Sequence, residues 1–160
     1  MTILKLSESI TFQEAIAATQ SLLEEMEAKR ASDREIKEAI ASLVKSTNGA
    51  RGFFVTYLTD DRPIADSPSE FVIEALKSSP ETVSELLVKN VAMSAAMAVV
   101  HRRNNDENMA QGSDRVCRRS INLIQQLQLD EITNKLKQLQ HSIATSEGSY
   151  GDFLQKWGYA

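Results

Sequence analysis

The sequence predicts an all-α protein, a single domain over residues 1–160 built as a bundle of about six or seven helices. Apolar residues recur at the helical period along most of the chain. Capping boxes, in which Ser or Thr precedes Glu by three residues, mark two helix starts. The stretch from Pro80 to Asn104 has no helix breaker after its first position and carries two apolar stripes, as a central helix with several neighbours does.

The first two helices follow from their capping boxes. One helix begins after Thr11, which has Glu14 three residues on, and it runs to about residue 30. The second begins after Ser32, which has Glu35 at the same spacing, and it ends near residue 46. A short link between two helices favours an antiparallel hairpin. The inward faces are predicted to be Phe12, Ala15, Ile16, Thr19, Leu22, Leu23 and Met26 in the first helix, and Ile36, Ile40, Leu43 and Val44 in the second.

The stretch 50–61, together with the Asn48-Gly49 pair that precedes it, is ambiguous. Asn48-Gly49 predicts a helix stop or a turn. Residues 52–59 have strand-like propensity, but only residues 2–6 could pair with them, and two isolated strands make a marginal sheet. We therefore predict a short buried helix, in which Phe53, Phe54 and Tyr57 fill the core.

The remaining elements are assigned from turn residues and apolar spacing. Residues 59–68 form a polar surface loop, residues 69–78 a short helix, and Ser79 caps the central helix. After a polar turn over 104–112, Ser113 and Asp114 offer caps for a helix to about residue 128. Asp130 caps another helix, and a final anchor follows near the C-terminus. The inward residues are predicted to be Val116, Ser120, Leu123, Ile124 and Leu127, then Ile132, Leu136, Leu139 and Ile143, and lastly Phe153, Leu154 and Trp157.

Composition excludes several classes of function. A net charge of −4 argues against a general nucleic-acid binder, which carries a basic face. The single cysteine favours a reducing compartment, and the N-terminus does not read as a signal peptide. The weakly polar run 91–100 is about half of the roughly 20 residues that span a membrane. We therefore expect a cytoplasmic protein with no nucleic-acid or membrane partner.

The strongest candidate site is a basic cluster at the end of the helical hairpin that the central helix and its successor would form. Planar guanidinium groups that converge there would suit phosphate or carboxylate. A structural or solubility role is favoured, because helix C-termini attract cations and carboxylates lie close by in the sequence. The candidate residues are His101, Arg102, Arg103, Arg115, Arg118 and Arg119.

Other chemistry finds little support. His101 as a general base has no Ser or Cys placed beside it by the sequence. Cys117 lies next to Arg118 and Arg119, which would suit a reactive thiol, but partly buried packing is favoured. The acidic loop around Asp60 lacks the pattern of a calcium site, and no phosphate-binding or dinucleotide motif occurs, so we expect no metal or cofactor. An apolar stripe with Met93 and Met97 favours core packing; its alternative is a groove that accepts a partner helix or a second copy.

Two runs, residues 89–104 and 111–119, resemble small uncharacterised helical proteins of cyanobacteria. The resemblance implies a cytosolic setting and no particular activity. The sequence as a whole favours a non-catalytic protein-interaction or assembly module, which would bind a protein partner or form a homodimer. The alternative is a domain that binds a small anion or phosphate ligand at the arginines, and an enzyme that uses His101 ranks third.

Overall fold

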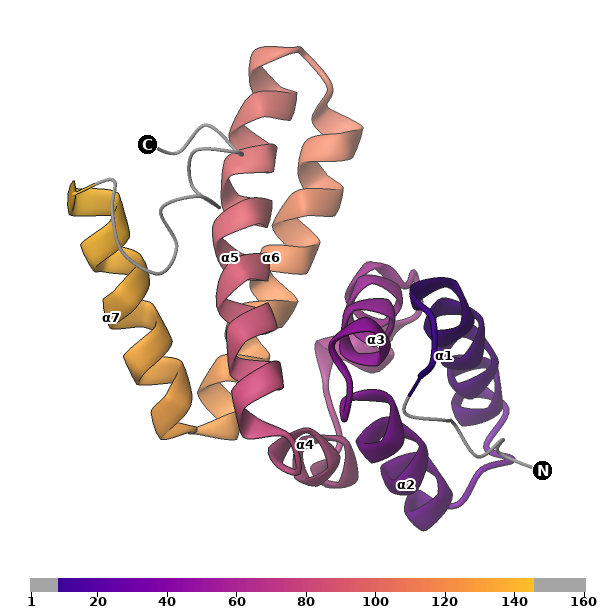
Figure 1. Ribbon diagram of the computed structural model, residues 1–160. Helices are drawn as coiled ribbons and strands as arrows, with labels where there is room; N and C mark the ends of the chain where they lie inside the picture. Colours follow the sequence, from indigo (N-terminus) through magenta and orange to yellow (C-terminus); the bar gives the residue numbers. More distant parts are fainter. Residues whose placement is uncertain (1–8, 146–160) are drawn as a thin grey trace.

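The computed structural model describes residues 9–145, and the regular structure in this range is all helical with no strand (Figure 1). The prediction of an all-α fold with a long central helix is confirmed. Seven α-helices and one short 3-10 turn, η1, occur in this range. Their bounds are α1 (Phe12–Glu27), α2 (Asp33–Leu43), α3 (Thr47–Thr59), η1 (Pro63–Asp66), α4 (Glu70–Lys77), α5 (Pro80–Arg103), α6 (Glu107–Leu127) and α7 (Asp130–Thr145).

Both predicted capping boxes are present. The Thr11 hydroxyl accepts a hydrogen bond from the Glu14 amide, and the Glu14 carboxylate accepts one from the Thr11 amide, each at 3.0 Å. Ser32 and Glu35 make the same pair of bonds at the start of α2. Each box satisfies two backbone N–H groups that a helix start leaves open, which fixes where the helix begins.

The predicted turn at Asn48-Gly49 is wrong, because both residues lie in the first turn of α3. The Ser46 hydroxyl caps this helix by accepting a hydrogen bond from the Gly49 amide at 3.0 Å. Gly49 stands where a Cβ would lie 2.1 Å from the Leu43 carbonyl oxygen, so the short link from α2 needs a residue without a side chain. The prediction that residues 52–59 form a buried helix is confirmed.

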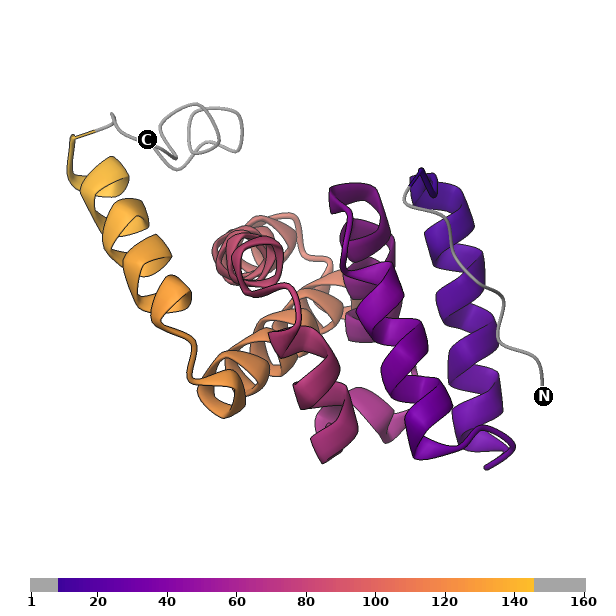
Figure 2. The ribbon, with the colours of Figure 1, turned by 60° about the horizontal axis from the view of Figure 1, so that its bottom comes forward.

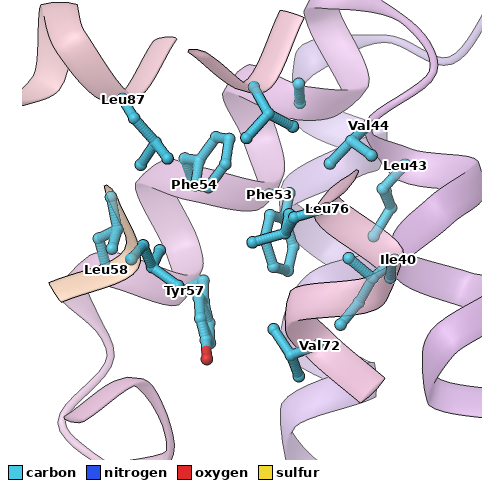
Figure 3. Packing of buried hydrophobic residues seen from close by; sticks show 14 of the residues in the cluster. Ile40, Leu43, Val44, Phe53, Phe54, Tyr57, Leu58, Val72, Leu76 and Leu87 are labelled. Atoms are coloured by element: carbon cyan, nitrogen blue, oxygen red, sulfur yellow. The ribbon is translucent and has the colours of Figure 1, made fainter. Parts of the chain in front are cut away.

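The core lies where α1–α4 meet the lower halves of α5 and α6, with α7 packed beside them, and Figure 3 shows part of it. The ring of Phe53 stacks on Tyr57 at 5.0 Å between centroids and meets Phe54 edge-on at 5.2 Å. All three side chains are 1% exposed, so the predicted filling of the core by these aromatics is confirmed. Leu76 of α4 and Leu87 of α5 pack around them, which joins the first four helices to the central one.

α5 and α6 form a long antiparallel hairpin whose upper half rises beyond α1–α4 (Figure 1). Ser79 precedes α5 as predicted, although its side chain makes no capping bond. The predicted caps Ser113 and Asp114 are wrong: α6 begins at Glu107, after Asp106, whose carboxylate accepts a hydrogen bond from the Met109 amide at 3.2 Å. Asp106 caps the helix seven residues before Ser113, so residues 107–112, which were predicted to belong to a turn, are helical.

α7 packs against α5 and runs in the same direction, and it inclines away from α5 as it rises (Figures 1 and 2). Of its predicted seam, Ile132 and Leu139 are buried and Leu136 is 37% exposed. Lys135 holds its lower end, with ion pairs to Glu81 and, at 3.0 Å, to Glu85. The predicted anchor of Phe153, Leu154 and Trp157 lies outside the described residues.

Candidate functional site

Arg119, one of the six predicted site residues, is buried at 3% exposure in the lower half of α6. Its guanidinium donates to the Asp66 carboxylate at 2.8 Å and to the carbonyl oxygens of Leu58, Asp60 and Arg62 at 3.1, 2.7 and 3.2 Å. These four acceptors belong to the end of α3, to the loop that leads into η1 and to η1 itself. Arg119 therefore clamps this loop onto α6, and its donors are engaged by the protein itself.

Arg102 and Arg115 are also held by carboxylates. Arg102 lies 2.6 Å from Asp114 and 3.2 Å from Glu107, at the closed end of the hairpin. Its hydrogen bond with Asp114, followed by that with Glu107, raises the pKa of the Arg102 guanidinium. Lower on α6, Arg115 pairs with Asp61 at 3.1 Å.

The structure thus divides the predicted cluster into two groups. Arg102 belongs with Asp114 at the end of the hairpin, whereas Arg115, Arg118 and Arg119 gather around the loop between α3 and α4. Arg103 is exposed and His101 is half-buried. Among the described residues, neither side chain forms a hydrogen bond or ion pair with either group.

Asp66 is the electrostatic centre of the second group. The hydrogen bond from Arg119 lowers the pKa of the Asp66 carboxyl, and the charges of Arg119, Arg118 and Arg115 lower it further. Because carboxylates already balance these guanidinium groups, an incoming phosphate would compete with Asp61, Asp66 and Asp114 for the same donors.

Beside this group lies an open hollow of about 640 Å³ between η1 and α6. Cys117 lines it and is half-buried, as packing predicts. Within residues 9–145, no three His, Cys, Asp or Glu side chains come close enough to hold a metal ion. The hollow is a surface between charged side chains that are paired with one another.

A larger groove of about 750 Å³ runs between α3 and the lower half of α5. Phe54, Val55 and Leu58 line it on the α3 side, and Leu86 and Met93 line it on the α5 side. Val55 is 44% exposed there, which is unusual for a large aliphatic residue beside an aromatic core. Charged side chains form its rim: Arg51, Glu81, Glu85, Lys89 and Lys135.

The wall of the groove continues upward as an apolar stripe on α5, formed by Leu86, Met93, Met97 and Val100. Residues 91–100 contain no charged side chain, and only Ser94 and Ala98 among them are buried. Val100 is 41% exposed and Val99 is 49% exposed. The upper half of α5 therefore presents apolar side chains that no described helix covers.

By length and composition α5 could also cross a membrane. An 18-residue window of Pro80–Arg103 has a mean hydropathy of 1.5, and 33% of that window is buried in the structure. One helix of this kind is weak evidence, because the central helix of a folded domain passes the same test.

A family model described as "Uncharacterised conserved protein UCP020893" matches residues 11–160. The chain belongs to this family. Among curated proteins and among solved structures, no significant match to the sequence is found. The family description names no activity, so the site has to be judged from its own geometry.

Sequence reasoning placed Arg119 in an exposed basic cluster and missed its buried role. The signal was present: Arg119 lies three residues after Val116 and four before Leu123, both on the predicted inward face of the helix. A charged residue on a buried face needs a partner, and the acidic loop around Asp66 supplies one. The groove-lining residue Val55 was also missed, because the helix bounds of α3 were not yet fixed.

Proposed function

We propose that this protein is a non-catalytic assembly module whose α5–α6 hairpin docks onto the same hairpin of a second copy. The observation that carries the proposal is the uncharged run 91–100, in which only Ser94 and Ala98 are buried. Val99 and Val100 of this run are exposed, whereas Met93 and Met97 are half-buried, and an apolar surface of this kind that continues along a helix is typical of an interaction site. A cyanobacterial, cytosolic setting, which the sequence resemblance implies, remains part of the proposal.

The spacing of the stripe suits contact with another helix. Leu86, Met93, Met97 and Val100 follow one another at intervals of seven, four and three residues, the repeat of a helix that meets one partner helix. Two such stripes related by a two-fold axis between Met93 and Met97 run antiparallel. Each Val100 then lies near the partner's residues 86–90, and the contact is self-complementary.

The groove between α3 and α5 accommodates the end of the partner's α5–α6 hairpin. α3 stands beside the lower half of α5, so a flat contact between two copies would be blocked there unless the surface were hollowed. The groove between Val55 and Leu86 provides that hollow, with about 750 Å³ of space. In the antiparallel arrangement it receives Val100 and the turn that follows α5.

Sedimentation equilibrium of the purified full-length chain over a range of concentrations tests the proposal. The wild-type chain is expected to be a dimer, and Met97→Glu, which buries a charge in the two-fold contact, is expected to be a monomer. Ile121→Glu is the matched control, because Ile121 is 40% exposed on the hollow of α6 and lies off the stripe. Circular dichroism melts verify that each variant is folded.

Three results would contradict the proposal. The first is a wild-type monomer at about 100 µM, which means an association free energy weaker than about −5.5 kcal/mol. The second is a dimer that Met97→Glu leaves intact. The third is a monomer that binds anionic lipid vesicles in a manner abolished by Met97→Glu, which would assign the stripe to a membrane surface.

A further inference from the structure

We infer that α6 supplies the second half of the docking face, and that Gly112 is the place where α6 of the second copy approaches most closely. The inference rests on the proposed dimer, to which it adds the second helix of the hairpin. The stripe on α5 is a single row of side chains, whereas a hairpin presents two helices to a partner. The row on α6 consists of Met109, Gly112 and Val116.

The row on α6 lies on the same side of the hairpin as the stripe on α5. Met109, Gly112 and Val116 follow one another at intervals of three and four residues, so they fall within about 60° of one another around the helix. Val116 lines the groove together with Leu86 and Met93 of the α5 stripe. The two rows therefore form one face.

The two rows also lie at the same height in the hairpin. Met97 stands six residues, about 9 Å, before the last residue of α5, and Gly112 stands five residues, about 8 Å, after the first residue of α6. Because the helices are antiparallel neighbours joined by a short turn, Met97 and Gly112 are level with each other (Figure 1). The proposed two-fold axis passes between Met93 and Met97, so Gly112 lies close to the centre of the contact.

The symmetry of the proposed dimer brings the two copies of α6 together. An axis that runs across both helices, between the two hairpins, sets each α5 antiparallel against the other α5. The same rotation sets each α6 antiparallel against the other α6. The result is a four-helix contact, in which the row on α6 meets its own copy.

The row on α6 is open in the single chain. Met109 is 55% exposed, more than any other large apolar side chain in the described range. Gly112 is exposed and Val116 is half-buried. A Cβ at Gly112 would meet nothing within 4 Å among the described residues. This side of α6 therefore has room for another helix.

The described chain gives no steric reason for a glycine at residue 112. A Cβ at Gly49 or Gly52 would collide with the backbone of a neighbouring segment, whereas Gly112 has an ordinary helical backbone and open space. Glycine in the interior of a helix costs stability relative to alanine. A backbone that approaches from outside the chain gives this glycine a structural use, and in the two-fold contact that backbone is α6 of the second copy.

Sedimentation equilibrium of Gly112→Leu and Gln111→Leu tests the inference. Gly112→Leu is expected to raise the dimer dissociation constant by at least about tenfold, because each copy brings a leucine into the contact. Gln111→Leu is the matched control: the neighbouring exposed residue of α6 receives the same side chain about 100° away from Gly112. It is expected to leave the dissociation constant within about twofold of the wild type.

Two further variants separate an effect on the contact from an effect on the fold. In the monomeric Met97→Glu background, Gly112→Leu is expected to melt no lower than Met97→Glu alone, because the space is open and leucine favours the helix. Met109→Glu places a charge in the same row without touching the glycine, and it is expected to dissociate the dimer as well.

The outcomes distinguish this inference from the proposed dimer. A wild-type dimer that Met97→Glu dissociates, but that Gly112→Leu and Met109→Glu leave intact, would overturn the inference and leave the dimer on α5 alone. A lower melting temperature for Gly112→Leu in the Met97→Glu background would also overturn it, because the glycine would then serve the chain itself. A wild-type monomer would contradict the proposed dimer, and the inference with it.

Discussion

The contact between α1 and α3 and the upper half of the α5–α6 hairpin each contain a helical glycine, and the two glycines stand in opposite surroundings. A Cβ at Gly52 would lie 2.4 Å from the Cβ of Ala15 and 2.9 Å from the Phe12 carbonyl oxygen. A Cβ at Gly112 would meet nothing within 4 Å. One region is packed to the limit of backbone approach, whereas the other has open space around its helices.

The same contrast runs along α5 itself. Its lower half buries Val83, Ser84, Leu87 and Val88, whereas its upper half buries only Ser94 and Ala98. Ser94 turns its hydroxyl back onto the Asn90 carbonyl oxygen of its own helix at 2.6 Å. The lower half of α5 thus buries more of its side chains than the upper half, on which the proposed contact with a second copy lies.

Removal of the Arg119 clamp, which joins the two regions, should have the largest effect. Arg119→Ala is expected to lower the free energy of unfolding by about 3 kcal/mol, because three carbonyl oxygens and Asp66 lose a buried, charged donor. Urea unfolding measures the loss. Arg118→Ala is the control: Arg118 is 67% exposed and 3.9 Å from Asp66, and its loss should cost less than about 1 kcal/mol. Equal losses would mean that Arg119 is an ordinary surface cation.

The two glycines test the contrast directly. Gly52→Ala is expected to destabilise the protein by about 2 kcal/mol, because α1 and α3 have to move apart to admit a methyl group. Gly112→Ala is expected to stabilise it by up to about 1 kcal/mol, because alanine favours the helix and the space is open. Thermal melts of the two variants should shift in opposite directions; shifts of the same sign would contradict the contrast.

A smaller effect is expected from acid. The hydrogen bond from Arg119 holds the pKa of Asp66 below its unfolded value of about 4, so its contribution is complete above that pH. The contribution is lost as the pH falls through the lowered pKa of the folded state. The unfolding free energy of Asp66→Asn should therefore decline less steeply below pH 4 than that of the wild type. Parallel declines in urea titrations would show that Asp66 is not responsible.

The smallest effect is expected at the aromatic core. The Tyr57 hydroxyl is buried and has no hydrogen-bond partner among the described residues, and burial raises its pKa. Tyr57→Phe removes a polar group that packing leaves unsatisfied, so stability should stay within about 1 kcal/mol of the wild type or rise. A clear loss in urea unfolding would reveal a partner for this hydroxyl.

Much of the fold could be predicted from the sequence because periodic apolar residues and capping boxes are local signals. The failures occurred where a local signal was overruled by a neighbour. Asn48-Gly49 has turn composition, but the Ser46 hydroxyl takes up the Gly49 amide and starts a helix. Asp106 likewise captures the Met109 amide and starts α6 ahead of Ser113. Which of several neighbouring residues becomes the N-cap depends on the backbone geometry at which the following helix can start.

The candidate site was harder to predict, because its character depends on partners distant in sequence. The six basic residues are close along the chain or across a hairpin, and that much was visible. Which carboxylates they meet was not, since Asp61 and Asp66 belong to a loop more than fifty residues from Arg115 and Arg119. The apolar stripe was visible from its spacing, but the groove beside it required the position of α3.

The Arg119 clamp also bears on the order in which the chain folds. Its hydrogen bond to Leu58 joins residues 61 apart, and contacts of that separation form only after a large loop has closed. The contacts of α1 with α3 and of α2 with α4 close smaller loops than this hydrogen bond does, whereas the loop after α3 reaches its final shape only when α6 arrives. The lower end of the α5–α6 hairpin thus completes the folding of α1–α4, whereas α1–α4 leave its upper end uncovered.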